Sequence, residues 1–183
     1  MKALTLTQPW ATLVAIGAKK IETRSWSTPY RGPLAIHAAK RIPKEHGTLW
    51  LDEPFLGVLH SAGIVSISPS DLLAVFGGGT KYQLHADKLH LGCVLATCEL
   101  LNCIKIQEEQ HLCRRLDPAI GPVLPSFFPM DDLIWIPPSK GNEFAFGDYT
   151  PGRFAWLLAN VKLLPEPIPA RGALGLWDWD EQG

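Results

Sequence analysis

Short segments in which apolar and polar residues alternate recur along the chain, a pattern typical of strands buried on one face. The first such segment covers residues 2–7. Further strands are predicted over residues 19–26, 34–38, 92–106, 153–164 and 174–180. The run over residues 92–106 is rich in Val, Leu, Cys and Thr, which favours a buried strand.

The predicted helices are short. Thr7 can cap a helix that has Pro9 in its first turn and Gly17 at its end. Residues 43–63 are expected to be helical with breaks, and residues 70–79 to contain a short helix that three glycines end. Because strands dominate and no regular β–α–β alternation occurs, the pattern predicts an α+β fold, with a small β-barrel and short peripheral helices.

The composition of the chain limits the number of domains and the class of protein. The chain has 183 residues, of which 46% are hydrophobic and 19% charged, so we expect one globular domain over residues 1–183. Six prolines over residues 114–142 predict an irregular excursion from that domain. No apolar run approaches the roughly 20 residues of a membrane span, no signal peptide is evident, and the four cysteines lack zinc-like spacing. A cytoplasmic protein without membrane contact, metal or cofactor is therefore expected.

Charge is distributed unevenly along the chain. Residues 1–44 contain eight Lys or Arg but only one acidic residue, Glu22, whereas the whole chain has a net charge of −1. A lone carboxylate among cations, close to aromatic residues, suggests a site for a polar and anionic ligand. The basic first part of the chain is expected to form the binding face.

Strand alternation predicts how the side chains around Glu22 point. Glu22 and Arg24 fall on one face of the second predicted strand, and Ile21 and Thr23 on the other. Ile21 and Thr23 suit a barrel interior, so we expect Glu22 and Arg24 to point outward into a cleft. Lys19 would join them only from the turn that precedes the strand. The alternative is an ordinary solvated edge strand, on which lysines prevent unwanted pairing.

The residue types suit recognition of a nucleotide. Arg24 offers a planar fork for a phosphate or a base edge, and Glu22 can accept hydrogen bonds from an exocyclic amine or orient Arg24. A purely structural pair of these two residues is the alternative. Trp10 and Trp26 can stack on a base or pack in the core, and Gln8 can read a base edge or cap the first helix.

Three segments resemble the ASCH (activating signal cointegrator homology) family, which belongs to the PUA-like superfamily. Residues 4–10 resemble its first strand and helix start, and residues 17–24 match its G-x-K-x-x-E-x-R signature at all four positions. Residues 147–156 and 172–177 resemble C-terminal segments of bacterial members. The resemblance implies a barrel of five or six strands, a cleft beside the signature strand, and binding of RNA or a nucleotide.

The resemblance also implies an enzymatic alternative. Some small members are amidohydrolases that act on acylated cytidine, and others have been associated with ribonuclease activity. The amidohydrolase branch uses a Lys and a Thr three residues apart in the signature, together with a distant Glu. Here Lys19 is present, but Glu22 occupies the position of that Thr. Lys19 and Glu22 are the candidate catalytic pair if the protein is a hydrolase of RNA or of a modified nucleoside.

The leading hypothesis is an RNA- or nucleotide-binding domain, whose partner is single-stranded RNA, a nucleotide or a modified nucleoside. Tyr149 and Arg153 join the site mainly through the family resemblance. The predicted ligand-binding residues are Gln8, Trp10, Lys19, Glu22, Arg24, Trp26, Tyr149 and Arg153. A further alternative is a protein-interaction module, whose face would be the excursion at 114–142 with its Phe127, Phe128 and Trp135.

Overall fold

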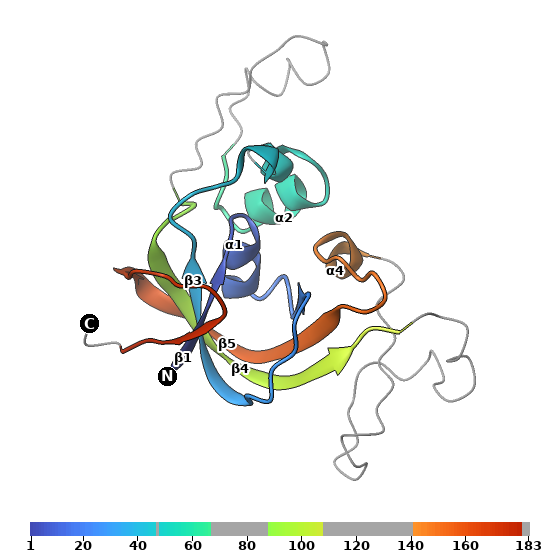
Figure 1. The fold of residues 1–183 in the computed structure, drawn as a ribbon. Coiled ribbons are helices and arrows are strands. Elements are labelled where there is room, and N and C mark those ends of the chain that lie inside the picture. Colours follow the sequence, from blue (N-terminus) through green and yellow to red (C-terminus); the bar gives the residue numbers. More distant parts are fainter. Residues whose placement is uncertain (47, 67–87, 108–140, 181–183) are drawn as a thin grey trace.

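The computed structural model describes residues 1–46, 48–66, 88–107 and 141–180. Six strands form one strongly curled sheet in the order β2-β5-β4-β3-β1-β6 (Figure 1). The strands are β1 (Lys2–Leu6), β2 (Ile21–Arg24), β3 (Gly32–Ala38), β4 (Cys93–Lys105), β5 (Phe154–Pro169) and β6 (Leu176–Asp178). β1 and β3 run parallel, and the other neighbours run antiparallel. The predicted α+β class, with a small barrel-like sheet and short helices, is confirmed.

The helices within the described residues are short. They are α1 (Trp10–Ala15), α2 (Phe55–Ser61), α4 (Asn142–Ala145) and two single 3₁₀ turns at Lys44–His46 and Leu49–Leu51. None of the helices in these parts of the chain is long and apolar enough to cross a membrane. The predicted helix at 70–76, and the excursion at 114–142 except for its last two residues, lie outside the described residues.

The start of α1 differs from the prediction. The N-cap residue of α1 is Pro9 and not Thr7; the amide of Thr12 in the first turn donates a hydrogen bond of 3.1 Å to Gln8 Oε1. A longer amide side chain thus takes over the capping role that the sequence pattern gave to a hydroxyl. The end of the helix is as predicted, because Gly17 has a φ of 75°, a left-handed conformation that glycine adopts without strain.

Helix α1 lies in the hollow of the curled sheet (Figure 1). Val14 and Ala15 belong to the main hydrophobic core, together with Ile36 of β3 and Trp156 of β5. The other side of the helix carries Leu13, which packs in a second cluster against α2. The apolar stripe of α1 therefore fills the concave side of the sheet, and α2 covers the helix from outside.

The register of β2 against β5 corrects the prediction for the signature strand. Glu22 pairs with Trp156, and Arg24 with Phe154. Since Trp156 is part of the main core, Glu22 and Arg24 lie on the concave face of the sheet and not on its outer face. Ile21 instead joins a small cluster on the opposite face. Strand alternation showed which residues share a face, but only the pairing with β5 decides which face is enclosed.

Candidate functional site

A cavity of about 770 Å³ opens where the curled sheet brings β2 opposite β1. Its volume lies in the range typical of small-molecule sites, about 300–1,000 Å³. A hydrogen bond of 2.8 Å from Arg24 Nη2 to the Thr5 carbonyl joins the two strands across it. The walls come from β1 and the residues after it, β2, the segment 145–148 and the segment 173–175.

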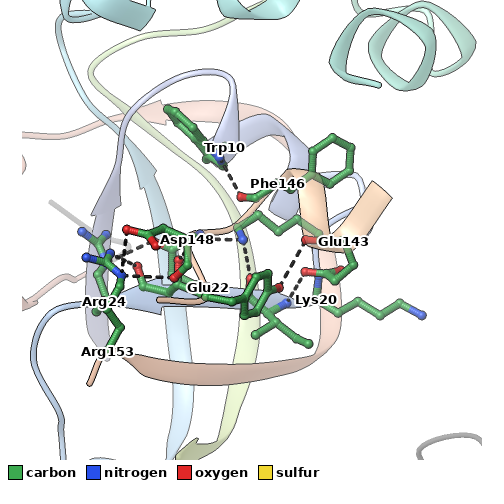
Figure 2. Close-up of polar contacts among 12 residues, drawn as sticks. Trp10, Lys20, Glu22, Arg24, Glu143, Phe146, Asp148 and Arg153 are labelled. Atoms are coloured by element: carbon green, nitrogen blue, oxygen red, sulfur yellow. Dashed lines mark hydrogen bonds and ion pairs between the residues drawn. The ribbon is translucent and has the colours of Figure 1, made fainter. Parts of the chain in front are cut away.

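Ion pairs organise the β2 wall of the cavity. The Glu22 carboxylate lies 3.1 Å from Arg24 Nε through Oε1, and 3.7 Å from Lys19 Nζ through Oε2. Glu22 is only 7% exposed, and such a buried carboxylate requires close cationic partners. Figure 2 shows Glu22 and Arg24 projecting from the strand toward the same space as Asp148 and Arg153. The pair is therefore prearranged and faces the cavity.

Lys19 supports this arrangement from inside the protein. It precedes β2 in the turn after α1, as the prediction required, but it is 0% exposed and does not line the cavity. Its Nζ donates a hydrogen bond to the Ile21 carbonyl. Burial lowers the pKa of Lys19, and the nearby Glu22 and Glu143 carboxylates oppose that shift. Lys19 thus pairs with Glu22 from behind the cavity wall, and a ligand in the cavity would not touch Lys19.

The segment around α4 is attached to the start of β2 by Glu143. Its carboxylate accepts hydrogen bonds from the amides of Lys20 at 2.9 Å and Ile21 at 3.0 Å (Figure 2). The Tyr149 hydroxyl donates to the Glu143 carbonyl at 3.2 Å. Burial, together with the Glu143 and Glu22 carboxylates, raises the pKa of Tyr149, so its hydroxyl stays protonated as a donor. Tyr149 holds this segment in place but does not line the cavity.

Asp148 and Arg153 line the cavity beside the edge of β2. Arg153 Nε lies 3.2 Å from Asp148 Oδ2, and Arg153 Nη2 donates to the Thr23 carbonyl at 3.3 Å. The hydroxyl of Thr150 is the main cause that lowers the pKa of Asp148, with Arg153 contributing less. The lowered pKa favours the charged carboxylate of Asp148, and hydrogen bonds to Thr23 attach both residues to the edge of β2.

Two tryptophans supply aromatic surface. Trp10 Nε1 donates to the Phe146 carbonyl at 2.8 Å, and the Trp10 ring meets His46 edge to face with a centroid distance of 4.8 Å. Trp26 packs edge to face on Trp156 with centroids 4.7 Å apart. Trp10 and Trp26 are half-buried and line the cavity. Their rings are thus fixed by packing, which favours stacking at a low entropic cost.

Gln8 has a structural role. It is fully buried, and its Nε2 donates to the His90 carbonyl at 2.8 Å while its Oε1 accepts from Thr12. Gln8 does not line the cavity. Of the two functions predicted for it, the structure shows helix capping.

Most of the cations of residues 1–44 do not line the main cavity. Lys2 forms an ion pair of 2.9 Å with Asp178, and Arg31 donates to Asn102 Oδ1 at 2.8 Å. Of these eight cations, Arg24 alone lines the main cavity, which also holds Arg153, Glu22 and Asp148. The cavity is therefore balanced in charge, and the predicted basic binding face does not form its walls.

The predicted ligand-binding residues thus divide into two groups. Those that line the cavity are Trp10, Glu22, Arg24, Trp26 and Arg153, whereas Gln8, Lys19 and Tyr149 lie behind its walls. The sequence analysis missed Thr5, His46, Phe146, Asp148 and Leu174, which also line it. Thr5, Asp148 and Leu174 stood within the segments 4–10, 147–156 and 172–177 that resemble the family, but no pattern in the sequence pointed to His46 or Phe146.

This geometry gives little support to the alternative that the protein is a hydrolase. Lys19 and Glu22 are in contact, but Lys19 Nζ is enclosed on the side away from the cavity. Thr23 contributes to the cavity wall, yet its Oγ1 accepts a hydrogen bond from the Asp148 amide at 3.1 Å. Within the described residues, no group of three or more His, Cys, Asp or Glu is placed to hold a metal ion.

Comparison with known proteins gives two findings. The family model of the ASCH domain matches residues 4–164. A stretch of 40 residues is 50% identical to activating signal cointegrator 1 of Homo sapiens, and equally to that of Mus musculus. This stretch covers 22% of the present chain and 7% of each relative. The similarity to these two proteins is thus confined to a small part of their length.

Proposed function

Because the chain belongs to the ASCH domain family, we propose that it binds single-stranded RNA and holds one nucleotide of it in the cavity between β2 and β1. Domains of this family are generally RNA-binding PUA-like domains. The observation that carries the proposal is the composition of the cavity, where the Glu22–Arg24 pair stands beside the rings of Trp10 and Trp26. Its volume of about 770 Å³ can accommodate a nucleoside.

Each wall suits a different part of a nucleotide. The half-buried rings of Trp10 and Trp26 offer stacking surfaces, and stacking contributes about 1–3 kcal/mol per base. The Glu22 carboxylate can accept hydrogen bonds from an exocyclic amine, and Arg24 can donate to a carbonyl or ring nitrogen. Because the cavity is balanced in charge, we infer that it recognises the base more than the phosphate. A base must leave the helical stack to enter it, which favours single-stranded RNA over a duplex.

Binding to the four ribonucleoside 5′-monophosphates and to short RNA homopolymers, measured by calorimetry, tests the proposal. We expect one base to be preferred, and duplex RNA to bind more weakly than single strands. Arg24→Ala and Glu22→Gln should each weaken binding by about tenfold or more, since a hydrogen bond to a charged group contributes about 1.5–3 kcal/mol. Lys162→Ala is the matched control, because Lys162 is exposed on β5 and does not line the cavity.

Two results would overturn the proposal. One is that none of these RNAs or nucleotides binds. The other is that Arg24→Ala and Glu22→Gln bind as tightly as Lys162→Ala, which would place any RNA site elsewhere on the molecule.

A hydrolase remains the second candidate, on the observation that buried Lys19 has a lowered pKa and contacts Glu22. Incubating the protein with N4-acetylcytidine and with single-stranded RNA, beside a Lys19→Met variant, tests it. Product that forms with the wild type and disappears with Lys19→Met would support the hydrolase. If the wild type forms no product, or if Lys19→Met remains active, this candidate is wrong. The single-domain organisation of residues 1–183 and the cytoplasmic location stay predictions.

A further inference from the structure

A second cavity, of about 300 Å³, lies next to the first. Thr5, Ala39, Ala173 and Leu174 line both cavities. These shared residues come from the ends of β1 and β3 and from the loop 170–175, which connects β5 to β6. The two cavities are therefore adjacent and share one wall.

The second cavity differs from the first in its charge. Its charged residues are Lys40 and Arg171, both exposed, and none of the described residues that line it is acidic. Most of its remaining surface is apolar, with Ala39, Ala170 and Ala173 among the lining residues. An apolar floor beneath two cations suits a ribose or base whose phosphate lies at the rim.

The polar side chains at the bottom of the second cavity already have hydrogen-bond partners within the protein. His37 is 1% exposed, and its two ring nitrogens lie 3.2 Å from Thr5 Oγ1 and 3.1 Å from the Ala170 carbonyl. Trp177 Nε1 donates to the same Thr5 Oγ1 at 3.1 Å. Both nitrogens of His37 are thus engaged, so recognition of a ligand falls to the rim residues.

Close packing fixes the position of the loop 170–175. A Cβ at Gly172 would lie 2.4 Å from His37 Cε1 and 2.8 Å from Thr5 Oγ1, so this backbone approaches the sheet as only glycine allows. Two residues further along, Leu174 is 99% exposed at the wall that the cavities share. An apolar side chain held out on a fixed ridge resembles the apolar wedges that nucleic-acid-binding proteins insert between successive bases.

We propose that the second cavity is a subsite for the neighbouring nucleotide of the same RNA strand. Its phosphate lies at Lys40 and Arg171, its ribose or base covers the apolar floor, and Leu174 separates it from the base in the first cavity. This inference rests on the proposed function, because it assumes that the first cavity holds a nucleotide. It assigns to the protein a minimum ligand of two successive nucleotides.

The dependence of affinity on RNA length tests the subsite. The probes are the mononucleotide, the dinucleotide and a short homopolymer of each base, measured with the wild type and with Leu174→Ala, Arg171→Ala and Lys162→Ala. Leu174 and Arg171 are exposed, so their variants are expected to fold normally. For the wild type, the dinucleotide should bind about tenfold more tightly than the mononucleotide, in line with about 1–3 kcal/mol per stacked base.

The variants should remove that gain selectively. Arg171 lines only the second cavity, so Arg171→Ala should bind the mononucleotide as the wild type does but lose most of the gain from the second nucleotide. Leu174 lines both cavities, so for Leu174→Ala the quantity compared is the ratio of dinucleotide to mononucleotide affinity, which should fall. The association constant K falls as salt is added, so the slope of log K against log salt concentration is negative. Arg171→Ala should also make this slope less negative by about 0.7, the value for one phosphate contact on a single strand. Lys162→Ala should change neither quantity.

The outcomes separate the two proposals. If no RNA or nucleotide binds, the proposed function and the subsite both fail. If the mononucleotide binds but the second nucleotide adds no affinity, or if Leu174→Ala and Arg171→Ala keep the full gain, the subsite is wrong while the proposed function stands.

Discussion

His37 and Glu22 are both buried polar side chains of this sheet, but the clusters around them differ in how many of their hydrogen-bonding sites are occupied. Around His37, all the partners are neutral: the Thr5 hydroxyl, the Ala170 carbonyl and, through Thr5, the Trp177 ring N–H. Around Glu22 the partners are charged, with Arg24 and Lys19 at 3.1 and 3.7 Å. The polar atoms of the first cluster are all engaged with one another at the bottom of the second cavity, whereas the Glu22 carboxylate keeps capacity for further donors in the first cavity.

The difference shows that burial alone does not identify a binding site. An imidazole has two ring nitrogens, and both are engaged in His37. An ionised carboxylate has about four lone-pair sites, so two cationic neighbours leave Glu22 with capacity to accept further donors. The His37 cluster therefore stabilises the sheet, and the Glu22 cluster keeps its free capacity toward the cavity. Substitutions in one cluster should change stability, and in the other binding.

The largest effect is expected from His37→Ala. It removes a buried ring and leaves Thr5 Oγ1 and the Ala170 carbonyl without this partner, which should lower the free energy of unfolding by about 3 kcal/mol. Urea denaturation followed by circular dichroism measures this change. RNA affinity of the folded protein should fall far less than in Arg24→Ala. A loss of stability below about 1 kcal/mol would show that the His37 cluster is not structural.

Arg24→Ala should show the opposite behaviour. Binding of single-stranded RNA is expected to weaken by about 2 kcal/mol, because the substitution removes the guanidinium that lines the cavity and pairs with Glu22. Arg24→Lys should not restore it, since an ammonium lacks the planar fork. Fluorescence anisotropy measures the affinity, and thermal unfolding measures the accompanying change in stability. Full recovery with Arg24→Lys would mean that Arg24 acts only as a point charge.

Acid should destabilise the His37 cluster. Burial lowers the pKa of His37 from its usual 6.5, so the unfolded chain takes up a proton at a higher pH than the folded chain does. Stability is then complete above about pH 6.5 and falls as the pH drops from there toward the folded pKa, by at most about 1.4 kcal/mol per pH unit for this group. Denaturation curves at several pH values should show this slope in the wild type and a smaller slope in His37→Gln. Equal slopes in both proteins would contradict the assignment.

The smallest effect is expected from Asp148→Asn. Asp148 is largely exposed, so stability should change by less than about 1 kcal/mol. The substitution turns the balanced cavity positive, which should raise RNA affinity by about twofold at low salt and make its dependence on salt steeper. Titrations at low and at moderate salt measure both quantities. An unchanged salt dependence would mean that RNA does not approach this wall.

Alternation and turn residues were sufficient to predict the strands of the fold. All six predicted strands occur, because their patterns of buried and exposed positions are local properties of the sequence. The predicted second strand over residues 19–26 shortens to Ile21–Arg24, since the amides of Ala18 and Lys19 still bond to the Leu13 carbonyl at the end of α1. The strand therefore begins two residues later than predicted, at Ile21.

The candidate site could be predicted only in part. The signature pointed to Glu22 and Arg24, but their enclosure depends on pairing with β5, more than a hundred residues away. The role of Gln8 depends equally on a distant carbonyl, that of His90. Of the eight cations that precede residue 45, Arg24 alone lines the main cavity, so charge density along the sequence did not identify the walls of the site. Such long-range relations leave no local pattern.

The central claim, that a nucleotide occupies the cavity between β2 and β1, is tested most directly by a crystal structure with the tightest-binding short RNA. We predict one base inside the cavity, within hydrogen-bonding distance of Glu22 and Arg24 and against the ring of Trp10 or Trp26. RNA bound on another surface, with this cavity unchanged, would contradict the claim.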